Sequence, residues 1–142
     1  IRDRCMREII QETKNYKFTH IIVASGSGGT HSGSIVGKIY YKYNTNIIGI
    51  SVKDKKIDQE EKVLNLATKC CDYIKCAYPK REEILVFDDY VGKGYGIPTE
   101  GMREAVNLLA KKEAILLDPV YSGKSFNGLV DLINKKYFAC MH

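Results

Sequence analysis

A glycine-rich loop constrains the fold of this chain more than any other feature of its sequence. Its residues are Ser25, Gly26, Ser27, Gly28, Gly29 and Thr30. The loop follows the apolar run 20–24 and precedes a helical pattern over 32–43, so the predicted order is strand, loop, helix. Glycine permits positive φ angles and a close approach of the backbone, and the first turn of a helix has unpaired N–H groups. The loop is therefore predicted to bind an anion such as a phosphate group.

The loop departs from the two best-known nucleotide-binding motifs. In its closest fit to a nucleoside triphosphate loop, residues 28–33, the position that requires lysine is Ser34. In the two registers of the dinucleotide fingerprint, His31 or Thr30 stands where a glycine is required. Asp54, after the next predicted strand, resembles the ribose-binding acid of that motif only in its position. A glycine turn that merely lets the helix pack on the strand is the alternative to an anion site.

The composition is typical of a globular protein of one domain. The chain has 142 residues, 44% hydrophobic and 27% charged, and no apolar run approaches the length of a membrane span. Its net charge of +5 comes from lysines interspersed with acids, so no basic face for nucleic acid is predicted. The five cysteines form no C-x-x-C pair and no signal peptide is recognised, which favours reduced thiols and a cytoplasmic location.

Histidine and cysteine spacing predicts no metal site. His20, His31 and His142 do not complete a zinc-binding pattern. Cys70 and Cys71 lie in a helical pattern, where we interpret them as buried apolar side chains.

Helical and strand patterns alternate along the chain. Strands are predicted over 20–24, 46–52, 84–87 and 114–117. Helices are predicted over 3–14 and 32–43, from Asp58, which forms a capping box with Glu61, and from Thr99, which caps the next helix. A last helix is predicted to turn Phe126, Leu129, Val130 and Ile133 inward. The chain starts at Ile1, already inside a helical pattern, so we expect an excerpt of a longer chain or a processed piece. The alternation predicts an α/β domain with three layers, in which helices flank a mostly parallel sheet.

Three polar loops follow three of the predicted strands. They span residues 25–30, 88–98 and 118–125. Because ligands of parallel α/β sheets bind beyond the carboxyl ends of the strands, we expect the three loops to share one pocket.

The sequences of these loops resemble one enzyme family. Besides the glycine loop, the matching runs are Gly94-Tyr95-Gly96-Ile97-Pro98-Thr99-Glu100-Gly101 and Asp118-Pro119-Val120-Tyr121-Ser122-Gly123-Lys124. In order and spacing they resemble the pyridoxal-phosphate enzymes of the D-cysteine desulfhydrase and aminocyclopropane-carboxylate deaminase family, over nearly the whole chain. The resemblance implies the tryptophan-synthase-β-like fold (fold type II), pyridoxal 5'-phosphate as cofactor and a homodimer. It also implies that residues 1–142 are the later, cofactor-binding part of an enzyme whose N-terminal half is absent from this sequence.

The resemblance gives the loops specific roles. The first loop would hold the cofactor phosphate through its N–H groups and the Ser27 and Thr30 hydroxyls. Ser122 would face the pyridine nitrogen. Tyr95 would transfer a proton or hold the substrate against the ring, and Tyr121 would position the substrate and pack against the cofactor. For each tyrosine, a packing role with a solvated hydroxyl is the alternative.

Ser122 also bears on the activity that the resemblance implies. The deaminase branch has a glutamate at this position, which keeps the pyridine nitrogen protonated, whereas a hydroxyl leaves it largely unprotonated. The weaker electron sink suits β-elimination, so we expect a lyase that converts D-cysteine to pyruvate, hydrogen sulfide and ammonia. The alternatives are an aminocyclopropane-carboxylate deaminase and a non-catalytic phosphate-binding α/β module.

One functional group of the family has no counterpart here. Its cofactor forms a Schiff base with a lysine in the first half of the chain, and no lysine of this sequence matches that position. We interpret Lys124 as a surface cation at a helix start and Lys93 as a solvated loop residue. Residues 1–142 alone are therefore expected to bind the phosphate end of the cofactor without catalysing a reaction.

Overall fold

Three parallel strands form the centre of the protein. The structure is a computed structural model that describes residues 3–13 and 16–140. The strands β1 (His20–Ser25), β2 (Asn46–Ser51) and β3 (Leu85–Phe87) lie side by side in that order, and both pairs are parallel. In the register of the sheet, Ile22 lies opposite Ile48. The predicted strands 20–24, 46–52 and 84–87 are thus confirmed, with ends that differ by one residue.

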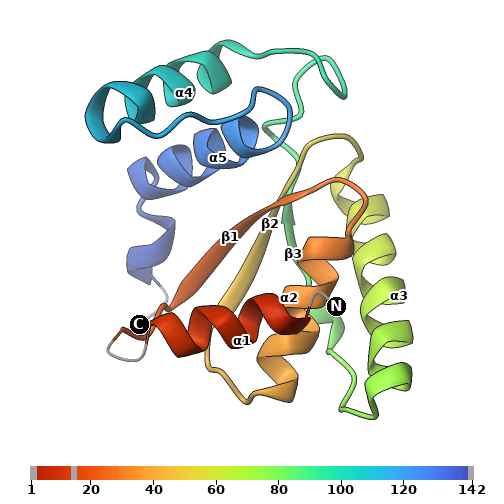
Figure 1. Ribbon diagram of the computed structural model, residues 1–142. Helices are drawn as coiled ribbons and strands as arrows, with labels where there is room; N and C mark the ends of the chain where they lie inside the picture. Colours follow the sequence, from red (N-terminus) through yellow and green to blue (C-terminus); the bar gives the residue numbers. More distant parts are fainter. Residues whose placement is uncertain (1–2, 14–15, 141–142) are drawn as a thin grey trace.

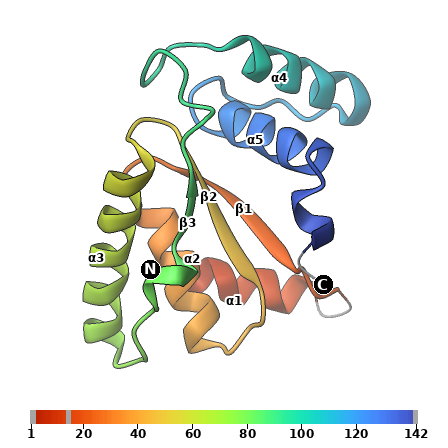
Figure 2. The same cartoon turned by 180° about the vertical axis from the view of Figure 1, so that it is seen from behind.

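Helices cover both faces of the sheet and complete the predicted three layers. The helices α1 (Asp3–Glu12), α2 (Gly29–Tyr40) and α3 (Lys56–Ile74) lie on one side, and α5 (Ser122–Asn134) packs on β1 and β2 from the other side (Figure 1). Figure 2 shows α4 (Glu100–Glu113) outside α5, away from the sheet. Two short 3-10 helices span Arg81–Glu83 and Tyr137–Cys140. The α/β class with a parallel sheet is therefore confirmed.

The core has one apolar cluster on each face of the sheet and a third, smaller one of Val36, Ala67 and Cys71 between α2 and α3. On the side of α1 to α3 the buried residues are Met6, Ile35, Ile47, Val63 and Ile84. On the side of α5 they are Ile48, Ile50, Tyr90 and Leu132. Successive side chains of a strand point to opposite faces, so β2 supplies both clusters and reads as a continuous apolar run. This burial fixes the sheet under the loops at its carboxyl end.

The predicted strand at 114–117 was wrong. Ala114 ends α4 in a left-handed conformation (φ 56°), the residues after it are irregular, and Leu116 is 85% exposed. A strand needs a neighbour that accepts its backbone hydrogen bonds. Among the described residues β1 pairs only with β2, and no strand lies along its other edge. The apolar run therefore lacks the partner that would make it a strand.

Other local predictions had mixed outcomes. The Thr99 cap of α4 is confirmed, because Thr99 Oγ1 accepts a hydrogen bond from the Met102 N–H at 3.2 Å. The capping box at Asp58 is wrong, since α3 begins two residues earlier, at Lys56. The predicted inward position of Ile133 is wrong as well: this side chain is 55% exposed and its neighbour Leu132 is buried.

The cysteine prediction holds in full only for Cys71. Cys71 is 1% exposed, and burial, helped by the Cys76 thiol, raises its pKa to about 12, which keeps it protonated and unreactive. Cys70 is half-buried. In the described part of the chain no three His, Cys, Asp or Glu side chains gather as metal ligands, and no helix has the length and apolar content to cross a membrane. Lys14, the predicted end of the first helix, and His142 lie outside the described residues.

Candidate active site

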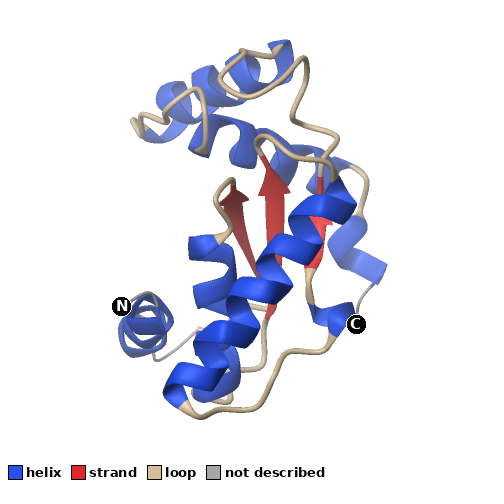
Figure 3. Cartoon of the chain, turned by 90° about the vertical axis from the view of Figure 1, so that its right-hand side faces the viewer, coloured by secondary structure: helices blue, strands red, loops and turns tan. Residues whose placement is uncertain are grey.

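The three polar loops lie together at one edge of the sheet. Figure 3 shows the three strand arrows pointing to the same end of the molecule, where α4 and α5 lie. The first loop lies against the third, because a Cβ added at Gly26 would lie only 3.2 Å from Tyr121 Cε1. Tyr121 in turn contacts Tyr95 through their phenol groups. The three loops therefore lie together as expected, although the single pocket predicted to be shared by all three is not seen in the part of the chain that the structure describes.

The glycine loop forms a tight turn into α2. Gly28 has a φ of 80° and a ψ of −9°, a left-handed conformation that favours glycine, and its carbonyl accepts the first helical hydrogen bond from the Ser32 N–H at 2.8 Å. The N–H groups of the first turn of α2 have no carbonyl partner within the helix. Ser27 and Thr30 expose their side chains beside them. Backbone donors, hydroxyls and the positive end of the helix dipole thus face the same solvent-accessible point.

Ser25 is the residue of this loop that faces inward. It is 1% exposed, and its hydroxyl accepts a hydrogen bond from Gln59 Nε2 at 2.7 Å and lies 3.1 Å from His31 Nδ1. Ser25 Oγ is thus hydrogen-bonded to both Gln59 and His31. Ser25 belongs to the loop predicted to bind the cofactor, but its hydroxyl is committed to the interior, where it anchors the loop.

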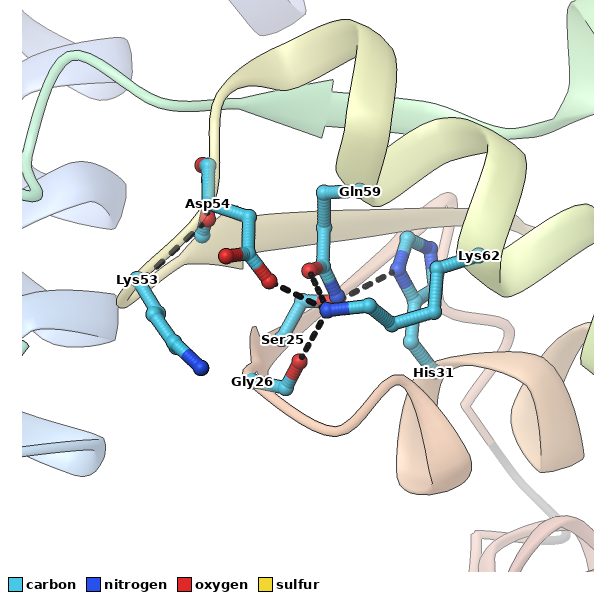
Figure 4. A network of polar contacts seen from close by, with 8 residues as sticks. Ser25, Gly26, His31, Lys53, Asp54, Gln59 and Lys62 are labelled. Atoms are coloured by element: carbon cyan, nitrogen blue, oxygen red, sulfur yellow. Dashed lines mark hydrogen bonds and ion pairs between the residues drawn. The ribbon is translucent and has the colours of Figure 1, made fainter.

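A second part of the same network holds the loop from α3. Lys62 Nζ donates to Gln59 Oε1 at 3.2 Å and to the Gly26 carbonyl at 3.4 Å, and it forms an ion pair with Asp54 (Figure 4). Asp54 is thus paired with a lysine and does not stand free for a ribose. A chain of hydrogen bonds thus connects Lys62 through Gln59 and Ser25 to the imidazole of His31, and this network restrains the side chains that form it.

His31 sits at the end of this chain as a neutral imidazole. It is fully buried, and burial lowers its pKa to about 4, against the opposing effect of the Ile47 carbonyl. Its ring lies against Gly49 of β2 so closely that a Cβ at that glycine would overlap it. Sequence reasoning considered His31 only as a metal ligand, whereas its position in the first turn of α2 makes it a support of the phosphate-loop turn.

Ser122 is held by Asp118 in the turn that begins α5. The Asp118 carboxylate accepts hydrogen bonds from the N–H groups of Val120, Tyr121 and Ser122 at 2.7 to 2.8 Å, and from the Ser122 hydroxyl. Although burial opposes the shift, these donors together lower the pKa of Asp118 to about 2. Ser122 Oγ also accepts from the Asp118 N–H at 2.9 Å. The serine hydroxyl is therefore fixed in place by a carboxylate four residues earlier.

The two predicted site tyrosines form a pair. Tyr95 and Tyr121 share a hydrogen bond between their phenol groups, and their rings meet edge to face with centroids 6.0 Å apart. This hydrogen bond raises the pKa of Tyr121, so Tyr121 retains its proton. Both side chains remain partly exposed, at 50% and 43%. Two phenols in contact at the rim of a site are able to exchange or relay a proton.

An open pocket of about 320 Å³ begins beside the tyrosine pair. Its walls are Ile22, Ala24, Leu117, Tyr121, Ser122, Ser125, Phe126 and Leu129. Of the predicted site residues, only Tyr121 and Ser122 line it directly. The glycine loop and Tyr95 adjoin it through their contacts with Tyr121.

Lys124 is the site residue that sequence reasoning misinterpreted. It is fully buried, and its Nζ donates to the carbonyls of Val91 at 2.8 Å and Gly94 at 3.0 Å. Burial lowers its pKa. A lysine in a polar run at a helix start is usually solvated, and no local pattern indicates that the 88–98 loop folds over it.

Comparisons with known proteins agree with this geometry. The profile of a family described as pyridoxal-phosphate-dependent enzyme matches residues 3–139. The crystal structure of an ACC deaminase homologue superposes with a TM-score of 0.86 at 32% sequence identity, over 95% of this chain and 40% of that one. This chain thus spans less than half the length of the solved homologue. With a family match over almost its whole length and the same fold as that homologue, the chain belongs to the pyridoxal-phosphate-dependent enzymes of fold type II.

Proposed function

We propose that this chain is the cofactor-binding part of a lyase that eliminates hydrosulfide from D-cysteine. The overall reaction converts D-cysteine and water to pyruvate, hydrogen sulfide and ammonia. The lysine that anchors the cofactor comes from a segment outside residues 1–142, and the complete enzyme is a cytoplasmic homodimer. The observation that carries the proposal is a hydroxyl, that of Ser122, on the wall of the pocket next to the tyrosine pair.

The residues present fit the cofactor that the family uses. The left-handed turn at Gly28 and the first turn of α2 offer N–H donors suited to a phosphate group. The pocket beside Tyr121 is mostly apolar, as a pyridine ring requires, and Ser122 gives it one polar group. Ser27 and Thr30 are proposed as further phosphate ligands because their side chains are exposed at the turn.

The tyrosine pair is proposed to move the protons of the reaction. Bound pyridoxal phosphate supplies an electron sink for the negative charge that develops at the substrate Cα. Tyr95 Oη would give a proton to the departing sulfur. Tyr121, whose phenol group is hydrogen-bonded to that of Tyr95, would orient the Tyr95 hydroxyl.

Ser122 distinguishes the proposed elimination from deamination. A hydroxyl beside the ring nitrogen does not enforce its protonation as a carboxylate does, and a β-elimination needs a weaker sink because the thiol departs with the electron pair. In this chain the Ser122 hydroxyl donates to the Asp118 carboxylate, and we propose that it turns this hydrogen to the ring nitrogen when the cofactor binds.

Replacing Ser122 tests this assignment in the complete enzyme. We expect Ser122→Glu to lower kcat for sulfide release from D-cysteine on the order of 100-fold, since the added carboxylate changes the charge beside the ring nitrogen. Ser122→Thr, which keeps the hydroxyl, is the matched control and should stay near wild type. An unchanged rate for Ser122→Glu would overturn the assignment.

The second candidate is an aminocyclopropane-carboxylate deaminase, favoured by the likeness to the ACC deaminase homologue. The products separate the two activities: sulfide and pyruvate from D-cysteine indicate the lyase, whereas ketobutyrate from the cyclopropane amino acid indicates the deaminase. Release of ketobutyrate without any sulfide would replace the first proposal by the second.

A further inference from the structure

Lys124 is unusual because its position opposes two general preferences. It is the largest fully buried side chain among the described residues, and it lies in the first turn of α5, where the helix dipole disfavours a cation. Burial of a charge is costly unless hydrogen bonds compensate for it. Among the described residues Lys124 has no ion pair, and its Nζ donates to two backbone carbonyls. A residue that violates local preferences in this way calls for a functional explanation.

The loop that accepts these hydrogen bonds has little structure of its own. Gly92, Gly94 and Gly96 all have positive φ angles, of 69°, 151° and 74°. The backbone hydrogen bonds within the loop are long: the Val91 N–H donates to Asp88 and the Ile97 N–H to Gly94, each at 3.3 Å. A chain with three such glycines has many alternative conformations when nothing outside it selects one.

The two carbonyls that Lys124 binds are well placed to orient Tyr95. The Gly94 carbonyl and the Tyr95 nitrogen belong to the same planar peptide group. By binding this carbonyl, the Lys124 ammonium group fixes the orientation of the peptide plane that carries the Tyr95 Cα. Tyr121, three residues before Lys124, holds the other end of Tyr95 through its phenol group. Residues at the start of α5 therefore bind both the backbone before Tyr95 and its hydroxyl group, and Tyr95 is the proposed proton donor.

We propose that Lys124 is a positioning residue of the active site: its buried ammonium group, bound to the carbonyls of Val91 and Gly94, acts as a tethered cation that holds the 88–98 loop so that Tyr95 reaches the reacting atoms. This inference rests on the proposed function for its kinetic test, and on the loop geometry alone for its physical test.

The kinetic test uses the complete enzyme with Lys124→Met, which keeps most of the side-chain volume and removes the charge. We expect kcat to fall on the order of 100-fold, the effect of misplacing a catalytic group by about 1 Å, with a much smaller change in KM. Lys93→Met is the matched control, because Lys93 lies exposed in the same loop, and should keep the wild-type kcat.

A double-mutant cycle with Tyr95→Phe separates positioning from general destabilisation. When Tyr95 has lost its hydroxyl, its orientation no longer matters, so Lys124→Met should then lower kcat by less than about threefold. An equal loss in both backgrounds, or a wild-type kcat for Lys124→Met alone, would overturn the inference.

Chemical rescue covers the case in which Lys124→Met fails to fold. Lys124→Ala is purified with propylammonium chloride, whose cation fits the vacated space and restores a donor to both carbonyls. We expect kcat to rise at least tenfold with added propylammonium and not with tetramethylammonium, which has no N–H donor. Equal effects of the two salts would contradict the proposal.

The physical test needs no turnover. Amide hydrogen exchange in residues 88–98 should be faster in Lys124→Met than in wild type and Lys93→Met, and unchanged exchange would overturn the inference. If the wild-type enzyme neither binds pyridoxal phosphate nor turns over either substrate, the proposed function fails, and the exchange experiment still decides whether Lys124 holds the loop.

Discussion

The buried imidazole of His31 links the pH dependence of folding to the phosphate loop. Its Nδ1 lies 3.1 Å from the Ser25 hydroxyl, and protonation of the imidazole would place a positive charge at this fully buried position. The ring has no room to turn away, since Gly49 lies directly against it. The loop is thus supported by a group that must remain neutral.

We predict that the free energy of unfolding decreases as the pH is lowered from about 6.5 to about 4, because of His31. Its pKa is lowered from 6.5 to about 4, so in this range the unfolded chain takes up a proton that the native chain does not. The contribution is fully present above pH 6.5 and is lost as the pH falls to 4, with a limit of about 3 kcal/mol. Urea unfolding between pH 7.5 and 4 measures it.

The control for this prediction is a neutral replacement. His31→Gln should be less stable at neutral pH but should show a flatter pH profile. Parallel profiles for wild type and His31→Gln would show that another group causes the acid sensitivity.

At the scale of elements, α2 lies close to β2 because Gly49 has no side chain. We predict that Gly49→Ala lowers the free energy of unfolding by about 1–3 kcal/mol, since its Cβ would overlap the His31 ring and force a shift. Adding His31→Ala opens space for the methyl group, so the double variant should be more stable than the sum of the two single effects. Thermal unfolding of the four proteins measures this coupling, and strict additivity would refute the contact.

Local sequence signals predicted the elements whose causes are local. The glycine loop and the Thr99 cap depend on neighbouring residues, and the structure has them where expected. The strand at 114–117 was wrong because a strand depends on a partner that no local pattern reveals. The start of α3 was misplaced for a related reason: Asp58 looks like a cap, but the Lys56 N–H is already satisfied by Asp88 at 3.0 Å, from a distant loop.

The site residues also divide into those that a sequence rule predicted and those that depend on distant segments. The rule that loops meet at the carboxyl end of a parallel sheet brought Tyr95 and Tyr121 together correctly, although they are 26 residues apart. The inward position of Ser25 was missed because it depends on a hydrogen bond from the distant Gln59. The burial of Lys124 was missed because it depends on the Val91 and Gly94 carbonyls, which are also far away in sequence.

At the scale of the whole molecule, the chain has features of a domain that further segments complete. The outer edge of β1 pairs with no strand among the described residues, and the apolar run at 114–117 leaves Ile115 and Leu116 exposed. The solved ACC deaminase homologue is covered by this chain over only 40% of its length. We therefore expect the cofactor-anchoring lysine, and strands that cover these surfaces, to come from residues outside 1–142.

The most direct test of this account is an intact and peptide mass measurement on the protein purified from its source, incubated with pyridoxal phosphate and reduced with borohydride. We predict a chain heavier than 16.1 kDa that carries one reduced cofactor adduct, on a lysine outside residues 1–142. A chain of 16.1 kDa without an adduct, or an adduct on a lysine within these residues, would contradict the claim that this is the phosphate-binding part of a larger lyase.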